Sequence, residues 1–512
     1  MNPVNHNLYA LFQAAFGPTP ERLAIETDQG QQYTFGDIDQ LTARMANWLQ
    51  SLGLQRGDRV MVQVEKSVPA LLFYLACLRA GVVYVPLNTA YQAAELAYFI
   101  ENAEPRVFVC DPARQADLAD LTQRLGVDHL VTLDGSGEGS LMTSALEHAA
   151  VQSIQPMLSD ELAAILYTSG TTGRSKGAQL THGNLASNAQ TLHRHWAWQD
   201  GDVLIHALPI FHVHGLFVAA HCALLNASKM LWMGKFSPKQ VLDWLPQATV
   251  FMGVPTLYVR LLQEKALDPA TCSHMRLFIS GSAPLLTETF TEWQARTGHT
   301  ILERYGMSET AMLTSNPCRP EEGPRKGGTV GRPLPGVQLR CVGEDEAPCA
   351  QGDVGSIQVK GPNVFPGYWR MPEANAKEFT ADGWFRTGDV GHFDADGYVT
   401  IVGRSKDLII TGGYNVYPAE VEGFINDMAG VDESAVIGCP HRDFGEGVVA
   451  VVVPKPGVTL DSAELLRQLK SQIAGFKVPK QLFVVNELPR NVMGKVQKNL
   501  LRQTYQAVFE GA

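Results

Sequence analysis

The sequence has no apolar run long enough to cross a lipid bilayer. Its longest conspicuous apolar stretch, residues 68–80, is about a dozen residues, whereas a membrane span needs about 20. This stretch predicts a buried helix instead. The amino terminus also lacks the basic segment and apolar core that together mark a secretion signal. We therefore expect a cytoplasmic protein that has no membrane partner.

Two other patterns are missing. The sequence contains no run of five or more lysines and arginines, and its net charge is -11, which argues against nucleic acid as a partner. Its eight cysteines are scattered and include no C-x-x-C pair of the kind that binds zinc or forms a redox dithiol. We expect these cysteines to be reduced and structural.

The chain of 512 residues is long enough for two to four structural units. Strand-like and helix-like segments alternate from residue 58 to 112, and an apolar strand ends near Tyr167. After Gly327 short strand-like pieces alternate with glycine and proline, and the last hundred or so residues predict a separate α+β unit. The predicted fold is α/β: a large N-terminal body of layered α/β subdomains with a small β-subdomain, followed by a small mobile α+β C-terminal domain.

Residues 167–177 form the most informative motif, YTSGTTGRSKG. Backbone amides, hydroxyls and one cation in such a loop can surround a polyphosphate. The lysine is not placed as in a Walker A loop, which disfavours a P-loop kinase or ATPase. The candidate phosphate-binding residues are Thr168, Ser169, Gly170, Thr171, Thr172, Gly173 and Lys176.

This loop resembles the phosphate-binding signature of the adenylate-forming superfamily, which includes acyl-CoA synthetases, peptide-synthetase adenylation domains and luciferases. Further motifs of that superfamily follow in order: YGMSET at 305–310, TGD at 387–389, the pair Gly403-Arg404 and PRNVMGK at 489–495. The resemblance implies catalytic roles for Lys495, Glu309 and Ser308, and Mg²⁺ binding by Glu309 with Thr171. It also implies ATP or AMP contacts from Gly281, Ser282, Ala283, Glu303, Tyr305, Gly306, Ser308, Asp389 and Arg404.

The same resemblance implies two domains, residues 1–404 and 405–512, with a hinge at Lys406. It places the coenzyme A tunnel near Gly412, Gly413, Tyr414 and Lys477. No carrier-domain pattern follows Lys495, so we expect free coenzyme A as the thiol acceptor. ATP, Mg²⁺ and coenzyme A are thus the expected cofactor and co-substrates.

Arg304 and His212 suggest which acid is activated. A guanidinium at the wall of the acyl pocket would bind a second carboxylate. Residues 303–307 and 208–215 resemble malonyl-CoA synthetases, which implies malonate, with methylmalonate as a second acid. The acyl contacts would come from Arg304, His212, Ser282 and Met307. The expected reaction makes an acyl-adenylate and pyrophosphate from malonate and ATP, and coenzyme A then displaces AMP.

Two alternatives stay open at this point. The acid could be a short fatty or aromatic monocarboxylate, with Arg304 paired to a neighbouring acid such as Glu303. The chain could also be an inactive nucleotide-binding relative, although Lys176, Glu309, Asp389 and Lys495 together argue against it. An aminoacyl-tRNA synthetase is disfavoured because the chain is acidic. Acetylation of Lys495 by an acetyltransferase is a further hypothesis from the resemblance, since it would remove that charge.

Overall fold

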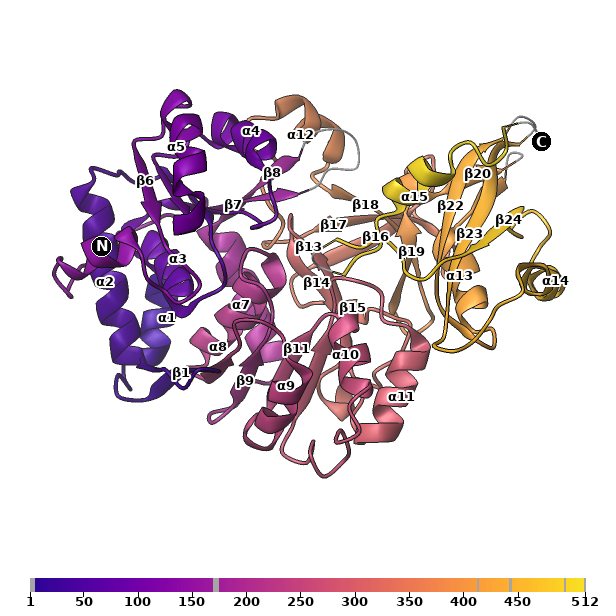
Figure 1. The fold of residues 1–512 in the computed structure, drawn as a ribbon, viewed down its shortest axis with the longest axis horizontal. Coiled ribbons are helices and arrows are strands. Elements are labelled where there is room, and N and C mark those ends of the chain that lie inside the picture. Colours follow the sequence, from indigo (N-terminus) through magenta and orange to yellow (C-terminus); the bar gives the residue numbers. More distant parts are fainter. Residues whose placement is uncertain (1–4, 169–174, 412–413, 442–443, 492–493, 511–512) are drawn as a thin grey trace.

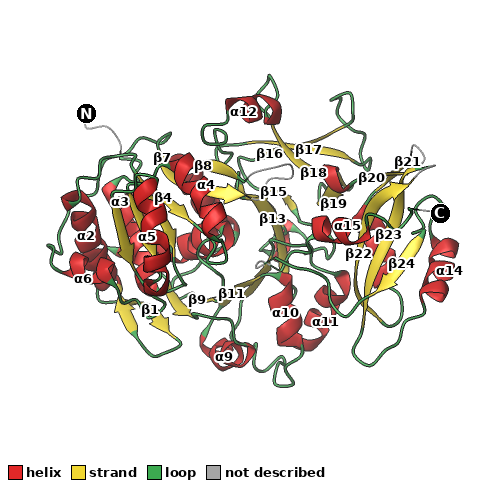
Figure 2. Ribbon diagram, turned by 45° about the horizontal axis from the view of Figure 1, so that its top comes forward, coloured by secondary structure: helices red, strands yellow, loops and turns green. Residues whose placement is uncertain are grey.

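The computed structural model describes residues 5–168, 175–411, 414–441, 444–491 and 494–510 (Figure 1). They form an α/β structure of four sheets (Figure 2), which confirms the predicted fold class. No helix within these ranges is both long enough and apolar enough to cross a membrane.

The first sheet has six strands in the order β6-β5-β3-β4-β7-β8, all parallel except β8. Its strands are β3 (Arg59–Gln63), β4 (Val83–Pro86), β5 (Val107–Cys110), β6 (His129–Thr132), β7 (Leu162–Thr168) and β8 (Lys176–Thr181). The helices that accompany it are α2 (Phe35–Ser51), α3 (Val68–Ala80), α4 (Ala93–Ala103), α5 (Gln115–Arg124) and α6 (Ser140–Leu146), with the short 3₁₀ turn η1 (Pro112–Arg114). The alternation predicted for residues 58–112 is confirmed.

Helix α3 has a capping residue at each end, and its side chains are buried on all sides. Ser67 caps its first turn by accepting a hydrogen bond from the Ala70 amide, and Gly81 ends it in the left-handed conformation. Almost every side chain between these caps is buried. A helix that is apolar on all sides is a core helix, so the prediction of a buried helix at residues 68–80 is correct.

The second sheet has nine strands in the order β15-β14-β13-β12-β11-β9-β10-β1-β2. They are β1 (Leu23–Thr27), β2 (Gln32–Thr34), β9 (Val203–His206), β10 (Lys229–Trp232), β11 (Val250–Gly253), β12 (Leu277–Ser280), β13 (Leu302–Met307), β14 (Ala311–Ser315) and β15 (Arg332–Pro333). The helical segments of this part are α1 (Leu8–Phe16), α7 (His182–His195), the π-helix η2 (His214–Ala220), α8 (His221–Leu225), α9 (Pro238–Trp244), η3 (Leu245–Gln247), α10 (Pro255–Leu262), α11 (Thr287–Thr297) and η4 (Pro320–Glu322). Its central strands are parallel, and functional groups in such sheets gather at the carboxyl ends of the strands.

The third sheet is the small antiparallel β-sheet predicted after Gly327. Its strands are β16 (Gln338–Val342), β17 (Gly355–Lys360), β18 (Phe385–Phe393) and β19 (Val399–Arg404), and α12 (Pro372–Glu378) lies between β17 and β18 in the chain. Strand β18 contains the TGD motif, and β19 ends at Arg404. The register pairs Asp389 with Arg404, so both residues lie at one end of this strand pair.

The last sheet contains β20 (Ile409–Thr411), β21 (Tyr414–Val416), β22 (Val431–His441), β23 (Gly445–Pro454) and β24 (Gln481–Val484). Helices α13 (Pro418–Asn426), α14 (Ser462–Gln472) and α15 (Lys498–Tyr505) accompany it, and the 3₁₀ turn η5 (Ser405–Asp407) precedes it. Two hydrophobic clusters in this part contain only residues from Ile409 onward. This arrangement agrees with a separate unit, while the boundary at residue 404 and the hinge at Lys406 stay predictions.

Candidate active site

A cavity of about 630 Å³ brings together motif residues that lie far apart in the sequence. Its wall includes residues from β7, β8, β13, the ends of β18 and β19, and the segment around Lys495. The sequence-predicted residues on this wall are Thr168, Lys176, His212, Ser282, Arg304, Gly306, Met307, Ser308, Glu309, Arg404, Lys406 and Lys495. One site thus contains the candidate phosphate, acyl and catalytic groups.

The other predicted residues are distributed differently. Gly281, Ala283, Glu303, Tyr305 and Asp389 are not part of the cavity wall, although each neighbours a residue of that wall in the chain or contacts one. Tyr414 stacks on Phe476 with ring centroids 4.7 Å apart, and Lys477 pairs with Glu420 at 2.6 Å, both away from the wall. Ser169, Gly170, Thr171, Thr172, Gly173, Gly412 and Gly413 lie outside the described residues.

Glu303 and Arg304 are consecutive residues of strand β13, and their side chains point to opposite faces. Successive side chains of a strand point to opposite faces, and only Arg304 reaches the cavity. Glu303 accepts a hydrogen bond from the Leu285 amide at 3.2 Å on the other side. Burial raises the pKa of Glu303 to about 8. Glu303 therefore anchors the segment that follows Ser282, and neither a hydrogen bond nor an ion pair joins it to Arg304 among the described residues.

Arg304 is a buried cation whose guanidinium has free donors. Only 2% of the residue is exposed, and Nε and Nη2 have no hydrogen-bond partner among the described residues. Burial lowers the pKa of Arg304, although a guanidinium is rarely deprotonated in proteins. Leaving one partner of a buried ion pair unpaired costs about 3–5 kcal/mol. The site is therefore built to accept an anion beside Arg304.

His212 extends this polar wall, and His214 is buried outside the wall but contacts Ser282, which lines it. The π-helix η2 begins at His214, directly after the segment that carries His212. Burial and the neighbouring Lys495 and Arg304 lower the pKa of His212 to about 3, so its ring is neutral. Burial also lowers the pKa of His214, whose Nδ1 lies 3.2 Å from Ser282 Oγ. Neutral rings can donate hydrogen bonds without repelling Arg304.

Glu309 also lines the cavity and is buried. Tyr368 donates a hydrogen bond to its Oε1 at 2.9 Å, and burial raises the pKa of the carboxyl. No group of three or more histidine, cysteine, aspartate or glutamate side chains that could hold a metal occurs in the described ranges. One carboxylate facing this cavity nevertheless fits Mg²⁺, which commonly takes one or two carboxylates together with substrate phosphates.

Asp389 and Arg404 form an ion pair at the edge of the cavity. Arg404 Nε lies 2.7 Å from Asp389 Oδ1, and Tyr305 donates its hydroxyl hydrogen bond to Asp389 Oδ2. The Asp389 charge raises the pKa of Arg404. The aspartate is only 3% exposed, so its orientation is fixed by two partners before a ribose could bind.

Two cations of the site have different surroundings. Lys176 pairs with Glu378 at 2.9 Å and lies over the ring of Tyr368. Lys495 is an exposed residue that lines the cavity. Loss of hydration there lowers its pKa, and nearby Arg404 lowers it further. Lys495 therefore lies among the charged groups of the site, although it is far from them in the sequence.

Comparison with known proteins identifies the chain's family. The family model described as AMP-binding enzyme matches residues 12–369, and that described as AMP-binding enzyme C-terminal domain matches residues 420–495. The chain belongs to the AMP-binding enzyme family. This AMP-binding enzyme is similar along nearly its whole length to several characterised proteins.

Two curated relatives and two solved structures illustrate that similarity. The mitochondrial malonate–CoA ligase of Homo sapiens is 36% identical over 95% of this chain and 90% of its own length. The oxalate–CoA ligase of Arabidopsis thaliana is 32% identical, with 95% and 96% covered. ATP-bound MatB from Rhodopseudomonas palustris is 53% identical with a TM-score of 0.96, covering 99% of this chain and 100% of that chain. Apo MatB, also 53% identical and with the same coverage, gives a TM-score of 0.85.

Sequence reasoning did not find two residues of the AMP-binding enzyme's site. Tyr368 and Glu378 belong to no motif, although they contact Glu309 and Lys176. These contacts join residues about 60 to 200 positions apart in the chain. No local pattern could have revealed them.

Proposed function

We propose that this AMP-binding enzyme is a malonate–CoA ligase. It would activate malonate with ATP, release pyrophosphate, and transfer the malonyl group from AMP to coenzyme A. Methylmalonate would be a second acid. The similarity to a malonate–CoA ligase over nearly the full chain supports the class of reaction. The surroundings of Arg304 support the choice of a dicarboxylate.

The assignment of a dicarboxylate substrate depends on Arg304. Its unpartnered Nε and Nη2 offer the planar donor pair that binds a carboxylate bidentately. A monocarboxylate would leave this buried charge without a counter-ion after its own carboxylate had moved to the phosphate. The second carboxylate of malonate would supply that counter-ion, while Ser282, His212 and Met307 would contact the rest of the acid.

The first half-reaction would use the charged groups of the cavity. One malonate oxygen attacks the α-phosphorus of ATP, and the bond from that phosphorus to pyrophosphate breaks. Lys495 neutralises the negative charge that develops, an electrostatic effect that is usually the largest in such sites. Lys176 would bind the outer phosphates, and Asp389 and Arg404 would orient the ribose. Mg²⁺ held by Glu309 would neutralise phosphate charge when bound.

The second half-reaction would require a change in domain arrangement. Lys495 fills part of the cavity in this structure, and the thiol of coenzyme A must reach the same acyl carbon. Rotation of residues 405–512 about Lys406 would withdraw Lys495 and let the thiol in. The fit to the ATP-bound form of MatB is closer than to the apo form, which supports an adenylation-state arrangement here.

Acid preference tests the proposal. Purified enzyme would be supplied with ATP, Mg²⁺ and coenzyme A, and with malonate, methylmalonate, acetate, butyrate or coumarate. Pyrophosphate and the acyl-CoA product would be measured separately. Malonyl-CoA as the preferred product supports the proposal. Preference for a monocarboxylate would reject the dicarboxylate assignment, and absence of pyrophosphate with every acid would favour an inactive relative.

Acetylation of Lys495 and a cytoplasmic location are further parts of the proposal. Acetylation would remove the ammonium charge from the cavity and so stop adenylation. Protein acetylated stoichiometrically at Lys495 should lose pyrophosphate release, and a deacetylase should restore it. Retained activity would argue against such control. Imaging of a fluorescent fusion of the whole chain would test the location.

A further inference from the structure

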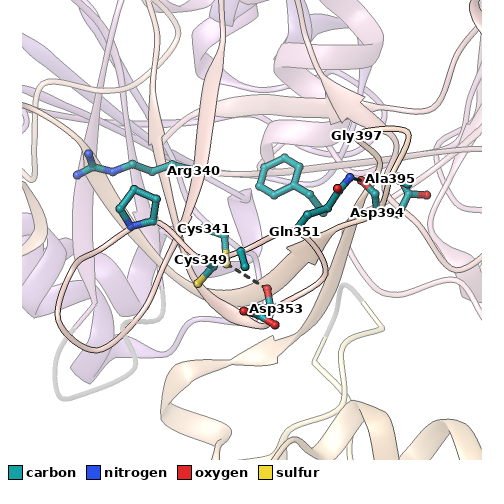
Figure 3. Close-up of a pocket in the computed structure, with 11 residues that line it drawn as sticks. Arg340, Cys341, Cys349, Gln351, Asp353, Asp394, Ala395 and Gly397 are labelled. Atoms are coloured by element: carbon teal, nitrogen blue, oxygen red, sulfur yellow. Dashed lines mark hydrogen bonds between the residues drawn. The ribbon is translucent and has the colours of Figure 1, made fainter.

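A second cavity, of about 420 Å³, lies in the small β-sheet, and two cysteines line one end of it (Figure 3). Cys341 belongs to β16, and Cys349 follows the turn that reverses the chain after this strand. Both are free thiols. Cys341 is almost fully buried, whereas Cys349 is half-buried.

The backbone places the two cysteines directly opposite each other. Val342 forms an antiparallel bridge with Pro348, and the Cys349 amide donates a hydrogen bond to the Cys341 carbonyl oxygen at 2.9 Å. Opposed residues of a hydrogen-bonded antiparallel pair have Cα atoms about 5.5 Å apart. Disulfides usually join Cα atoms about 4.4–6.8 Å apart. The hairpin therefore already has the spacing that a disulfide needs.

Gly355 on β17 confirms that the sulfur atoms share one small space. A Cβ at this position would lie 2.5 Å from Cys349 Sγ and 2.9 Å from Cys341 Sγ. The glycine thus leaves room for both sulfurs side by side. Burial, followed by the direct interaction with the Cys349 thiol, raises the pKa of the Cys341 thiol to about 12. Cys341 is therefore protonated in the reduced protein and donates hydrogen bonds to the Gly391 and Asp353 carbonyl oxygens at 3.3 and 3.7 Å.

We propose that Cys341 and Cys349 form a dithiol modification site that a small-molecule disulfide, such as glutathione disulfide, oxidises reversibly to an internal disulfide. This differs from the expectation that all cysteines are merely structural. Both cysteines line the cavity, and Cys349 is the attacking group because it is the more exposed of the two, whereas the buried Cys341 is the resolving group.

The exchange balances in two steps. Cys349 Sγ attacks one sulfur of glutathione disulfide, which forms a mixed disulfide and releases one glutathione thiolate. Cys341 then gives up its proton, its Sγ attacks Cys349 Sγ, and the second glutathione leaves. Two protein thiols are oxidised, and one glutathione disulfide is reduced to two glutathione molecules. Excess dithiothreitol would reverse both steps.

Thiol counting and peptide mass spectrometry on the whole, native chain test this site. After treatment with glutathione disulfide, the wild type should lose two of its eight thiols, retain no glutathione, and yield linked peptides containing Cys341 and Cys349. Dithiothreitol should restore all eight. This measurement on the wild type needs no variant that could misfold.

Three variants test which cysteine attacks and which one resolves the mixed disulfide. Cys341→Ser lacks the resolving thiol and should keep glutathione attached at Cys349, whereas Cys349→Ser should leave Cys341 unmodified. Cys318→Ser is the matched control, because Cys318 is the other half-buried cysteine in the described ranges and should not affect the linkage. The proposal is overturned if the wild type keeps all its thiols, or if it accumulates the mixed disulfide without the internal one.

Discussion

The guanidinium of Arg304 packs directly over the bare Cα of Gly281. A Cβ at position 281 would stand 2.5 Å from Arg304 Cζ and Nη1 and 2.7 Å from Nε. Real Cβ atoms do not approach other atoms so closely, so a side chain at 281 would displace the guanidinium. Gly281 thus belongs to the proposed acid-binding site without lining its wall.

Gly281→Ala should impair use of malonate more than use of a monocarboxylate. Overpacking a filled site costs about 1–3 kcal/mol, which corresponds to about a 5- to 160-fold loss of kcat/KM for malonate if Arg304 moves. Kinetics with malonate and butyrate would measure it. Gly423→Ala is the control, because no atom lies within 4 Å of its Cβ and its site is an exposed position in α13. Equal losses for both acids would argue that Gly281 only supports folding.

Glu378→Gln should lower the KM for ATP. Glu378 holds Lys176 at 2.9 Å and places a negative charge beside the proposed phosphate site. Partly exposed ion pairs of this kind are worth about 0.2–1 kcal/mol, so we expect a change of about two- to fivefold. Glu373→Gln, on the same helix α12 but exposed, is the control. A raised KM would instead mean that Glu378 positions Lys176 for ATP.

Glu303 should make stability depend on pH. Its pKa is about 8 in the folded protein and about 4.3 when unfolded. At pH values between these two pKa values, the folded state binds a proton that the unfolded state has lost. The stabilisation of the folded protein by this proton is fully present below the unfolded pKa and is lost as pH rises through 8. Glu303→Gln should keep the acceptor for the Leu285 amide and remove this fall. Urea unfolding would give the free energy of unfolding of both proteins at pH 5.5 and at pH 8.5. An identical change in this free energy between the two pH values in both proteins would contradict the assignment.

Lys406→Pro should impair thioester formation while sparing adenylation. Proline fixes φ near -65°, and the proposed rotation requires the backbone at residue 406 to change. Pyrophosphate release and acyl-CoA formation would be followed separately. Lys406→Ala, which keeps the backbone free, should retain both. Equal loss of both half-reactions in the proline variant would mean that Lys406 is not the hinge.

The sequence predicted those parts of the fold that local patterns determine. The alternation predicted for residues 58–112 became β3, β4 and β5 with the helices between them, and the apolar strand predicted to end near Tyr167 became β7. Many of the described motif residues also meet in one cavity, because the fold brings separate strands and loops together there. Their individual roles stay predictions.

Long-range packing could not be predicted in the same way. The contact of Gly281 with Arg304, the pairing of Lys176 with Glu378 and the bond from Tyr368 to Glu309 each depend on how separate elements pack. Alternation along β13 did imply that Glu303 and Arg304 point apart. That rule could have weakened the proposed Glu303–Arg304 pair before the structure was known.

The ratio of kcat/KM for malonate to that for butyrate, in the wild type and in Arg304→Ala, tests the central assignment most directly. A charge-assisted hydrogen bond contributes about 1.5–3 kcal/mol, so the ratio should fall about 10- to 100-fold in the variant. In Arg304→Lys the ratio should fall less, because lysine keeps the charge but lacks the planar donor pair. Arg124→Ala, which removes an exposed cation paired with Asp120, is the control and should keep the wild-type ratio. An unchanged ratio in Arg304→Ala would contradict recognition of a second carboxylate by this residue.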